Sequence, residues 1–421
     1  MFHSALNKAR NARSAGDMDS AAKAYLDALA LQLAPAEAAE AHGFVAGWRA
    51  AKNDFTTAIK HYRACYALCD PDPALEFELA FALESAGDVK EALNHYLKAL
   101  ALAPNNARHH LFAGAALDVL ARHDEALQVW SIGADLDPAL RRLKDHPQAN
   151  QGIRERSRRA DKALREFFTA QHQTAVMEFD APRIEKAIWA QTHNQPFYFQ
   201  TPQQRPHLFY VPDLPAQPVF SDLDWAPAFD NYWREIRDEY LAIEKTVHGS
   251  PYVHERAKLG ADWAKLKGSQ SWRSIHLYQN GVLDEDIAVH FPKTLRAIQN
   301  APTVKLDGAP LEVFFSVLAP NTKIPHHFGL ANSRLTVHLP LIVPNKCALT
   351  VAGENYTWRE GKILAFDDSF DHAAENSSDE PRVVLIFEAW APDLSDTERQ
   401  AIEASFSVRN AWRELRRIPK K

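Results

Sequence analysis

The sequence lacks any long hydrophobic run. Among its 421 residues, no stretch approaches the roughly 20 apolar residues that a membrane-spanning helix needs. The N-terminal segment MFHSALNKARNARSAGD also has none of the apolar core of a secretory signal. We therefore expect a cytoplasmic protein with no transmembrane segment.

Cysteine and excess positive charge are also scarce. Three cysteines, Cys65, Cys69 and Cys347, are too few for a disulfide framework, and we interpret them as reduced thiols. The 48 basic and 54 acidic residues give a net charge of −6, which offers no general case for nucleic-acid binding. Apolar residues at 46% and charged residues at 24% exclude a wholly disordered chain, a collagen-like fibre and a coiled-coil rod.

A repeated pattern runs through residues 1–140, which are rich in alanine and leucine. Aromatic residues recur at separations of 37, 34 and 34 residues, at Tyr25, Tyr62, Tyr96 and Trp130. Small alanines flank each aromatic residue, and we expect a proline to close each unit, at Pro35, Pro71, Pro104 and Pro138. The period and pattern resemble tetratricopeptide repeats, which implies an all-α solenoid of four helix pairs.

Two roles are open for these repeats. Their concave groove is suited to a peptide or a partner protein. The alternative is a structural lid or an oligomerisation surface. The sequence does not say whether the groove faces the rest of the protein.

The chain changes character after residue 140. We expect a helical linker over 141–195, where the basic stretch RERSRRADKALREFF predicts a helix with a solvated charged face. Six prolines between Pro196 and Pro218 indicate extended chain at a domain entrance. Short β-rich runs follow from about residue 270 and predict an antiparallel sandwich or barrel within 196–421: SWRSIHLYQNG, LEVFFSVLAP, RLTVHLPLIVP, CALTVAG, KILAFDD and RVVLIFEAW.

Histidines and an arginine cluster along these strands. His327 is expected in a loop before the strand 334–341, and His372 at the end of the run KILAFDD. Ten residues later, Arg382 opens an apolar and therefore buried strand, where a guanidinium needs a carboxylate partner. Two neutral imidazoles can bind a transition metal, and an arginine can hold a dicarboxylate. This combination suits a non-haem Fe(II) site that uses 2-oxoglutarate.

The third metal position is left open by the sequence. The usual facial triad is His-x-Asp/Glu with a distant His, but Gly329 takes the acidic position here. Water, a halide or a carboxylate could complete the site. We interpret Asp367 and Asp368 as residues of the turn that orients His372.

These motifs resemble the aspartyl/asparaginyl β-hydroxylase family. The likeness rests on the His-x-Gly loop at His327, the run Phe-Asp-Asp-Ser-Phe-x-His ending at His372, and Arg382 ten residues on. It is strongest over 316–394 and implies a double-stranded β-helix, a cupin-like jelly roll, that uses Fe(II), 2-oxoglutarate and O₂. It assigns His327 and His372 to the metal and Arg382 to the cosubstrate. His338, Ser316 and Trp272 fall on further cosubstrate positions.

The whole chain is thus expected to be an α+β multidomain protein, with a repeat solenoid followed by an oxygenase domain. The resemblance implies hydroxylation of an unactivated C–H bond, foremost the β-carbon of an Asp or Asn in a peptide, a protein or a related small molecule. The alternatives are a lipid acyl-chain hydroxylase or a halogenase on the same iron site, and a non-catalytic binding scaffold. One departure concerns substrate clamping, because Thr336 stands where some members carry an arginine. Substrate and oligomeric state are left open.

Overall fold

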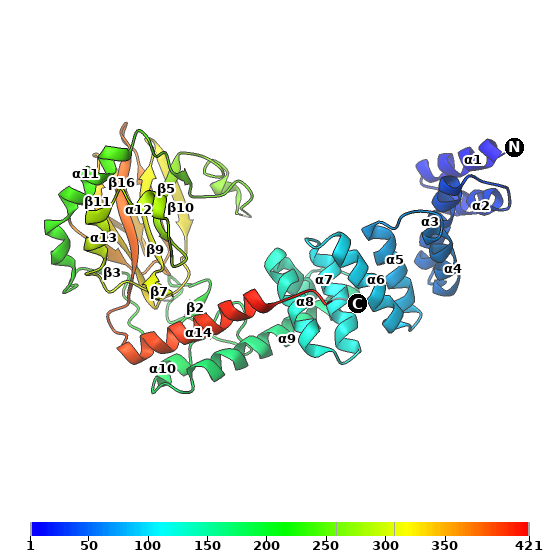
Figure 1. Ribbon diagram of the computed structural model, residues 1–421, viewed down its shortest axis with the longest axis horizontal. Helices are drawn as coiled ribbons and strands as arrows, with labels where there is room; N and C mark the ends of the chain where they lie inside the picture. The colour runs from blue at the N-terminus through cyan, green and yellow to red at the C-terminus, as the bar shows by residue number, and fades with distance from the viewer. Residues whose placement is uncertain (1, 258, 307, 420–421) are drawn as a thin grey trace. The chain divides into compact units, whose positions relative to one another are not determined.

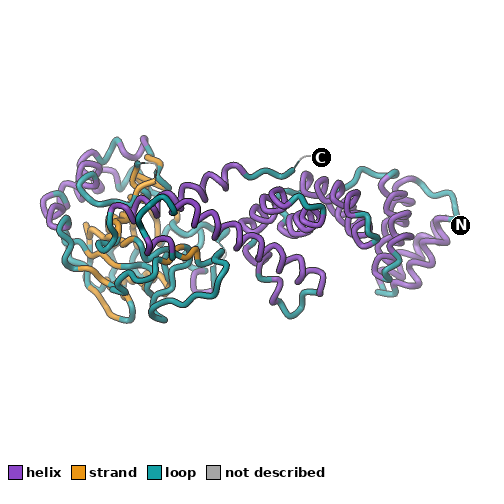
Figure 2. Tube along the Cα trace, turned by 90° about the horizontal axis from the view of Figure 1, so that it is seen from below, coloured by secondary structure: helices purple, strands orange, loops and turns teal. Residues whose placement is uncertain are grey.

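The computed structural model describes residues 2–257, 259–306 and 308–419. It divides into two compact units. One runs up to Phe167 and includes the segment from Trp412, and the other runs from Phe168 to Ala411. In the described residues, every strand belongs to the second unit (Figure 2). The sequence analysis places domain boundaries at residues 140 and 195, which differ from the limits of these two compact units. The sequence-based boundaries stay a prediction.

The first unit contains four antiparallel helix pairs, stacked in chain order (Figure 1). The predicted four-repeat solenoid is therefore confirmed. Its helices are α1 (Phe2–Ser14), α2 (Met18–Leu29), α3 (Pro35–Ala51), α4 (Phe55–Tyr66), α5 (Pro73–Ser85), α6 (Val89–Leu102), α7 (Ala107–Val119) and α8 (His123–Leu136). Two short 3₁₀ turns, η1 (Pro138–Arg141) and η2 (Leu143–Asp145), then lead to the long helix α9 (Gln151–Val176).

The same backbone device joins the helices within each pair. A residue with positive φ stands in the same repeat position four times: Gly16, Asn53, Gly87 and Ala121. In the first three repeats, an aspartate follows it and caps the second helix by accepting a backbone N–H three residues on. The fourth repeat has an alanine in the left-handed region and an uncapped helix.

The recurring aromatic residues fill the solenoid core. Their exposure does not exceed 4%, at Tyr25, Tyr62, Tyr96 and Trp130. The role predicted for the prolines is only partly right. Pro104 and Pro138 directly follow the ends of second helices, but Pro35 lies in the first turn of α3, where its missing N–H costs nothing. The charged face of α9 is also not simply solvated, because Arg156 and Arg159 bind Glu84 and Asp118 of the repeats.

The second unit is built on two antiparallel sheets. The larger has the order β3-β14-β11-β16-β9-β5-β4, with β6 paired to β5, and the smaller has the order β10-β15-β12-β13. The larger sheet comprises β3 (Val219–Phe220), β4 (Ser250–Pro251), β5 (Trp272–Gln279), β6 (Val282–Leu283), β9 (Glu312–Leu318), β11 (Arg334–Ile342), β14 (Leu364–Phe366) and β16 (Arg382–Trp390). The smaller comprises β10 (Thr322–His327), β12 (Cys347–Val351), β13 (Glu354–Tyr356) and β15 (His372–Asn376).

Short pieces complete this unit. Two more strand pairs are β1 (Ile188–Trp189) with β2 (Phe209–Tyr210), and β7 (Lys305–Leu306) with β8 (Ala309–Pro310). The helices are α10 (Pro182–Glu185), α11 (Trp233–Ile243), α12 (Glu285–Ala288), α13 (Pro292–Ile298) and α14 (Asp396–Leu415), with 3₁₀ turns η3 (Ala226–Asn231) and η4 (Ala261–Trp263). No described helix combines the length and the apolar character needed to cross a membrane.

Strand alternation gives the larger sheet two different faces. Odd-numbered residues of β9, β11 and β16 form the main core with α11 and α13, which cover that face (Figure 1). The even-numbered face looks toward the smaller sheet, and Trp272, Leu318 and Phe366 share a second core with Ile324, Leu349 and Ala374 of that sheet. This confirms the predicted sandwich of two packed antiparallel sheets and leaves its inner face for the polar residues.

Two strand assignments need correction. His327 is not in a loop but ends β10, and His372 does not end a strand but begins β15. β10 contains Pro325, which argues against a strand in the sequence, yet β10 is an edge strand where a missing N–H is tolerated.

Candidate active site

The two strands β10 and β15 bring the paired histidines together. His327 and His372 are direct strand partners, and their ring centroids lie 4.0 Å apart. The Nδ1 atoms lie 2.7 Å from the Pro325 carbonyl oxygen and 2.9 Å from that of Phe370, respectively. A carbonyl oxygen only accepts, so each Nδ1 donates its hydrogen and each Nε2 keeps a lone pair.

Burial keeps these two rings neutral. It lowers the pKa of His327 to about 4 and also lowers the pKa of His372. Neutral imidazoles whose second nitrogen is fixed by a backbone carbonyl are the usual form of a metal-binding histidine. The arrangement therefore fits a transition metal held through two Nε2 atoms.

A third protein ligand is absent from the part of the chain that the structure describes, where no cluster of three metal-binding side chains occurs. The reason lies at Gly329. A Cβ added there would stand 2.1 Å from Cγ of Asp368, so this carboxylate fills the space that an acidic side chain at position 329 would need. The Gly329 N–H donates to the Asp368 carbonyl oxygen over 2.6 Å, which locks the two backbones together.

Asp368 is more than a turn residue. Its Oδ2 accepts a hydrogen bond from the Thr336 hydroxyl over 3.2 Å, whereas its Oδ1 is buried without a partner in the described structure. Burial raises the pKa of Asp368, against the lowering effect of Arg334. Its neighbour Asp367 does serve the turn, because it accepts from the Ser369 N–H and the Gln204 amide, and burial raises its pKa to about 7.

Arg382 is the most unusual group on the inner face. Its side chain is only 1% exposed, and its Nε and Nη1 have no hydrogen-bond partner among the described residues. The guanidinium lies 5.0 Å from the centre of the Trp358 ring. Burial lowers the pKa of Arg382 to about 10, so it is still charged near pH 7. A buried cation with unused donors calls for an anionic ligand.

Two further donors share that face. The Trp358 indole donates to His338 Nδ1 over 3.1 Å, so the neutral ring carries its hydrogen on Nε2. Burial holds the pKa of His338 well below its usual value. The Trp272 indole likewise donates to the Ser316 hydroxyl over 3.1 Å, which leaves the hydroxyl hydrogen free. With Arg382, these groups can bind one carboxylate.

The other end of the inner face carries a closed ion pair. Thr336 stands opposite Glu388 in the β11–β16 register, and Arg334 Nη1 lies 2.9 Å from Glu388 Oε2. Burial raises the pKa of Glu388 to about 7, while Arg334 acts to lower it. The arginine missing at position 336 is therefore not replaced by Arg334, whose charge is already held by Glu388.

The structure thus brings all the predicted site residues onto facing parts of one sandwich, and it adds Trp358 and Asp368. Trp358 stands outside any motif, so the sequence does not mark it. Asp368 is interpreted from the sequence as a turn residue, and its approach to Gly329, 39 positions away, is not predicted. His276 lies 3.5 Å from Glu312 and 3.0 Å from the Ser274 hydroxyl, which agrees with a structural role.

Comparison with known proteins matches two parts of the chain to known families. A profile of the family described as Aspartyl/Asparaginyl beta-hydroxylase matches residues 230–392, and one described as Tetratricopeptide repeat matches residues 73–106. The C-terminal half carries an aspartyl/asparaginyl β-hydroxylase domain. The predicted combination of this hydroxylase domain with N-terminal tetratricopeptide repeats is confirmed.

Similar proteins cover the hydroxylase domain rather than the whole chain. Aspartate beta-hydroxylase domain-containing protein 2 of Xenopus tropicalis is 33% identical over 212 residues, which are 48% of this chain and 55% of that protein. Aspartyl/asparaginyl beta-hydroxylase of Homo sapiens is 28% identical over 223 residues, 51% of this chain and 28% of that protein. The chain thus spans about half the length of the first of these relatives and less of the second.

The solved structure of YrrB, described as a TPR protein with an unusual peptide-binding site, is also similar. It is 20% identical, covers 38% of this chain and 82% of its own, and has a TM-score of 0.32. A likeness at that TM-score adds nothing to the fold described above.

Proposed function

We propose that the hydroxylase domain is an Fe(II)- and 2-oxoglutarate-dependent dioxygenase that hydroxylates an unactivated C–H bond. The observation that carries this is the pairing of two neutral imidazoles, whose Nδ1 atoms donate to backbone carbonyls, with a buried arginine whose Nε and Nη1 have no hydrogen-bond partner among the described residues. Family membership of the domain supports the same reading.

The residues present fit these groups. His327 and His372 would hold the iron, while Arg382, His338 and Ser316 would bind the distal carboxylate of 2-oxoglutarate. Once bound, iron, 2-oxoglutarate and O₂ together supply the oxidant for hydroxylation, with succinate and CO₂ as co-products. The chain orients the imidazoles through the carbonyls of Pro325 and Phe370. Its buried aromatic side chains exclude water around the cosubstrate donors.

For the substrate, we propose an Asp or Asn β-carbon in a peptide, a protein or a related small molecule, on the strength of the family. Halogenation is disfavoured by Asp368. Its carboxyl group fills the space beside Gly329 that a halide would need. Arg334 is the only arginine on β11 within the described residues, and it is paired with Glu388. No guanidinium on this strand is therefore left for a substrate carboxylate, whereas an amide substrate does not need one.

For the repeats, we propose a polypeptide-binding role in the same protein. Four stacked helix pairs form the first unit, and a cavity lies among their first helices. This role is independent of the iron site and is tested separately.

Anaerobic visible spectroscopy of the full chain with Fe(II), with and without 2-oxoglutarate, tests the oxygenase proposal. We expect the weak metal-to-ligand band of an iron–2-oxoglutarate complex. His327→Ala and Arg382→Met should each abolish it. His326→Ala is the matched control, since this neighbouring imidazole is exposed and binds Asp371 instead. No band from a folded wild-type protein would overturn the proposal in favour of a binding scaffold.

Once the band is established, turnover identifies the substrate. Succinate formation and a mass gain of one oxygen atom are measured on paired peptides that differ only by Asp or Asn. We expect the Asn peptide to be favoured. An exclusive preference for Asp would contradict the argument from Thr336 and Glu388.

A further inference from the structure

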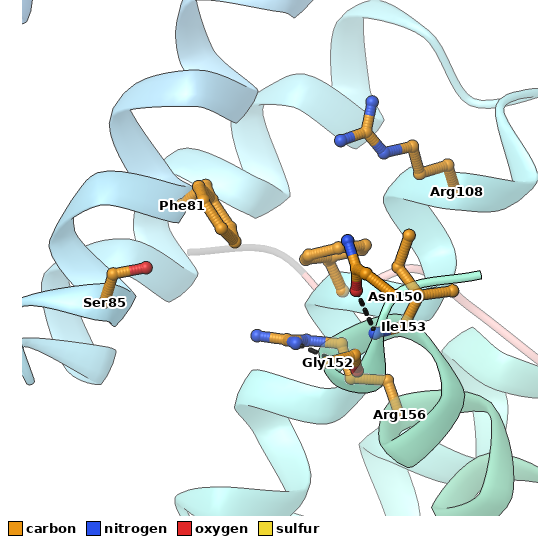
Figure 3. Close-up of a pocket in the computed structure, with 8 residues that line it drawn as sticks. Phe81, Ser85, Arg108, Asn150, Gly152, Ile153 and Arg156 are labelled. Carbon is orange, nitrogen blue, oxygen red and sulfur yellow. Dashed lines mark hydrogen bonds between the residues drawn. The ribbon is translucent and has the colours of Figure 1, made fainter. Parts of the chain in front are cut away.

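A cavity of about 380 Å³ lies within the first unit, away from the two sheets. Its walls come from α5, α7 and the start of α9, and residues of α6 and α8 do not line it. The cavity therefore lies on the side of the stack that the first helices of the pairs form. Figure 3 shows Phe81, Arg108, Ile153 and Arg156 pointing into a common space.

One wall of the cavity is apolar. The rings of Phe81 and Phe112 meet edge to face with centroids 6.2 Å apart, and Ile153 adds an aliphatic side chain at the first turn of α9. Phe112 is buried, whereas Phe81 and Ile153 are only half-buried. These two side chains can still bury surface against an apolar group of a ligand.

Two guanidinium groups lie against the same aromatic ring. Arg156 is 4.5 Å from the centre of the Phe112 ring, and Arg108 is 5.6 Å from it and 4.4 Å from that of Phe77. Packing on aromatic rings restricts the two groups while leaving N–H edges available, the geometry in which arginine binds carboxylates.

The two arginines differ in what they already bind. Arg156 donates to Glu84 over 2.7 Å and to the Gly152 carbonyl oxygen over 3.1 Å. Arg108 is exposed, and none of the hydrogen bonds and ion pairs found among the described residues involves its guanidinium. Two guanidinium groups therefore line the cavity, and one of them is paired with Glu84, which is not part of the lining. Arg108 is left to bind a ligand.

This charge balance selects among anions. A single carboxylate is matched by the one free guanidinium at Arg108. A phosphate dianion would need a second free cation, and Arg156 is already paired with Glu84. The amino-terminal end of α9, where Asn150 accepts from the Ile153 N–H, adds a small favourable potential for either anion.

We propose that this cavity binds a polypeptide segment that carries an aspartate or glutamate beside an apolar side chain. Arg108 receives the carboxylate, and Phe81, Phe112 and Ile153 receive the apolar side chain. The volume accommodates two adjacent side chains rather than a folded surface. The inference rests on the polypeptide-binding role proposed for the repeats and names the chemistry of the partner.

The test begins with selection of random dodecapeptides on the full-length protein, without iron or 2-oxoglutarate. Selected peptides should be enriched in Asp or Glu next to Phe, Leu or Ile. A fluorescein-labelled selected peptide is then titrated by fluorescence polarisation. Arg108→Glu should weaken binding by about tenfold to a hundredfold, the range for loss of a charge-assisted hydrogen bond.

Lys90→Glu is the matched control, because it makes the same change of charge at an exposed position of α6, outside the cavity. Melting curves of both variants check the fold. If the charge reversal in Arg108→Glu unfolds the repeats, Arg108→Gln is used in its place. Peptides that bind equally well to Arg108→Glu would overturn the inference but keep the polypeptide-binding role. Displacement by inorganic phosphate where acetate has no effect would replace the carboxylate by a phosphate. No selected peptide would overturn both.

Discussion

Replacing Arg382 by methionine should stabilise the unliganded protein while abolishing its response to 2-oxoglutarate. The two effects have one cause. The guanidinium is 1% exposed and has two donor nitrogens without a partner in the described structure, so it is placed for a ligand and not for the fold. Methionine keeps a comparable unbranched shape and removes the charge.

The magnitude follows from the pKa of Arg382. Burial lowers it from 12.5 to about 10, which corresponds to about 3 kcal/mol against the charged form. Contact with the Trp358 ring at 5.0 Å returns about 1–2 kcal/mol of that. The net gain on substitution is then about 1–2 kcal/mol, or roughly 2–8 °C for a unit of this size. Because the folded pKa is about 10, the gain should be constant from about pH 6 to pH 9.

Differential scanning calorimetry of the full chain measures both effects. The transition of the hydroxylase domain is recognised by its shift with Mn(II), a redox-inert substitute for iron, and 2-oxoglutarate. In the wild type, ligand at a hundred times its dissociation constant should add about 2.7 kcal/mol. In Arg382→Met, the transition should start higher and should not move with 2-oxoglutarate.

Arg334→Met provides the matched control. Arg334 lies on the same face and is 8% exposed, but it is ion-paired with Glu388. Its loss leaves a buried carboxylate without a partner, so we expect destabilisation by about 3 kcal/mol. The reasoning would be refuted if Arg382→Met lowered the melting temperature as Arg334→Met does while retaining the 2-oxoglutarate shift.

Three further predictions concern packing and protonation. Gly329→Ala should cost about 1–3 kcal/mol, since the new Cβ meets the Asp368 carboxylate, and the double variant with Asp368→Ala should recover most of this in urea unfolding; simple additivity would contradict the contact. In the repeats, Gly114→Ala should destabilise by about 1–3 kcal/mol, because its Cβ would lie 2.4 Å from the Trp130 indole, whereas Gly43→Ala, with space for a Cβ, should be neutral or stabilising by up to about 1 kcal/mol. Burial lowers the pKa of His172 to about 4, below its unfolded value of 6.5, so the unfolded state binds the proton more readily and stability is lost as pH falls from about 6.5 to 4. In urea titrations at successive pH values, His172→Gln should reduce this loss by up to about 3 kcal/mol. An unchanged loss would mean that His172 is not the group responsible.

Elements with a local signature could be predicted from the sequence. The spacing of the aromatic residues in the repeats predicts four helix pairs, and the structure contains them. The strand β16 could also be predicted, because a continuous apolar run that begins at Arg382 indicates a buried strand. β10 could not, because Pro325 and two histidines have low strand propensity, and only pairing with β15 makes that segment a strand.

Contacts between distant segments could not be predicted in the same way. The approach of Asp368 to Gly329 depends on the path of two turns, and the Trp358 indole reaches His338 across the sandwich. The cavity near Arg108 likewise needs three helices that are separated in the chain by two others. Each of these features depends on tertiary packing, which no residue spacing encodes.

Two arginines on the inner face of the larger sheet differ in what they contact, and this difference indicates their roles better than their residue type does. Arg334 and Arg382 both lie buried on this face. Arg334 Nη1 lies 2.9 Å from Glu388 Oε2, so at its end of the face the guanidinium already has an acidic partner. Arg382 lies over the Trp358 ring, and its Nε and Nη1 have no hydrogen-bond partner among the described residues. Ser316 and His338 there also retain a hydrogen to donate. A fold that tolerates an uncompensated cation in its core must recover that free energy from something that binds. Under the proposed function, the end with Arg382, Ser316 and His338 would bind the cosubstrate, and the end with Thr336 beside Asp368 would discriminate among substrates.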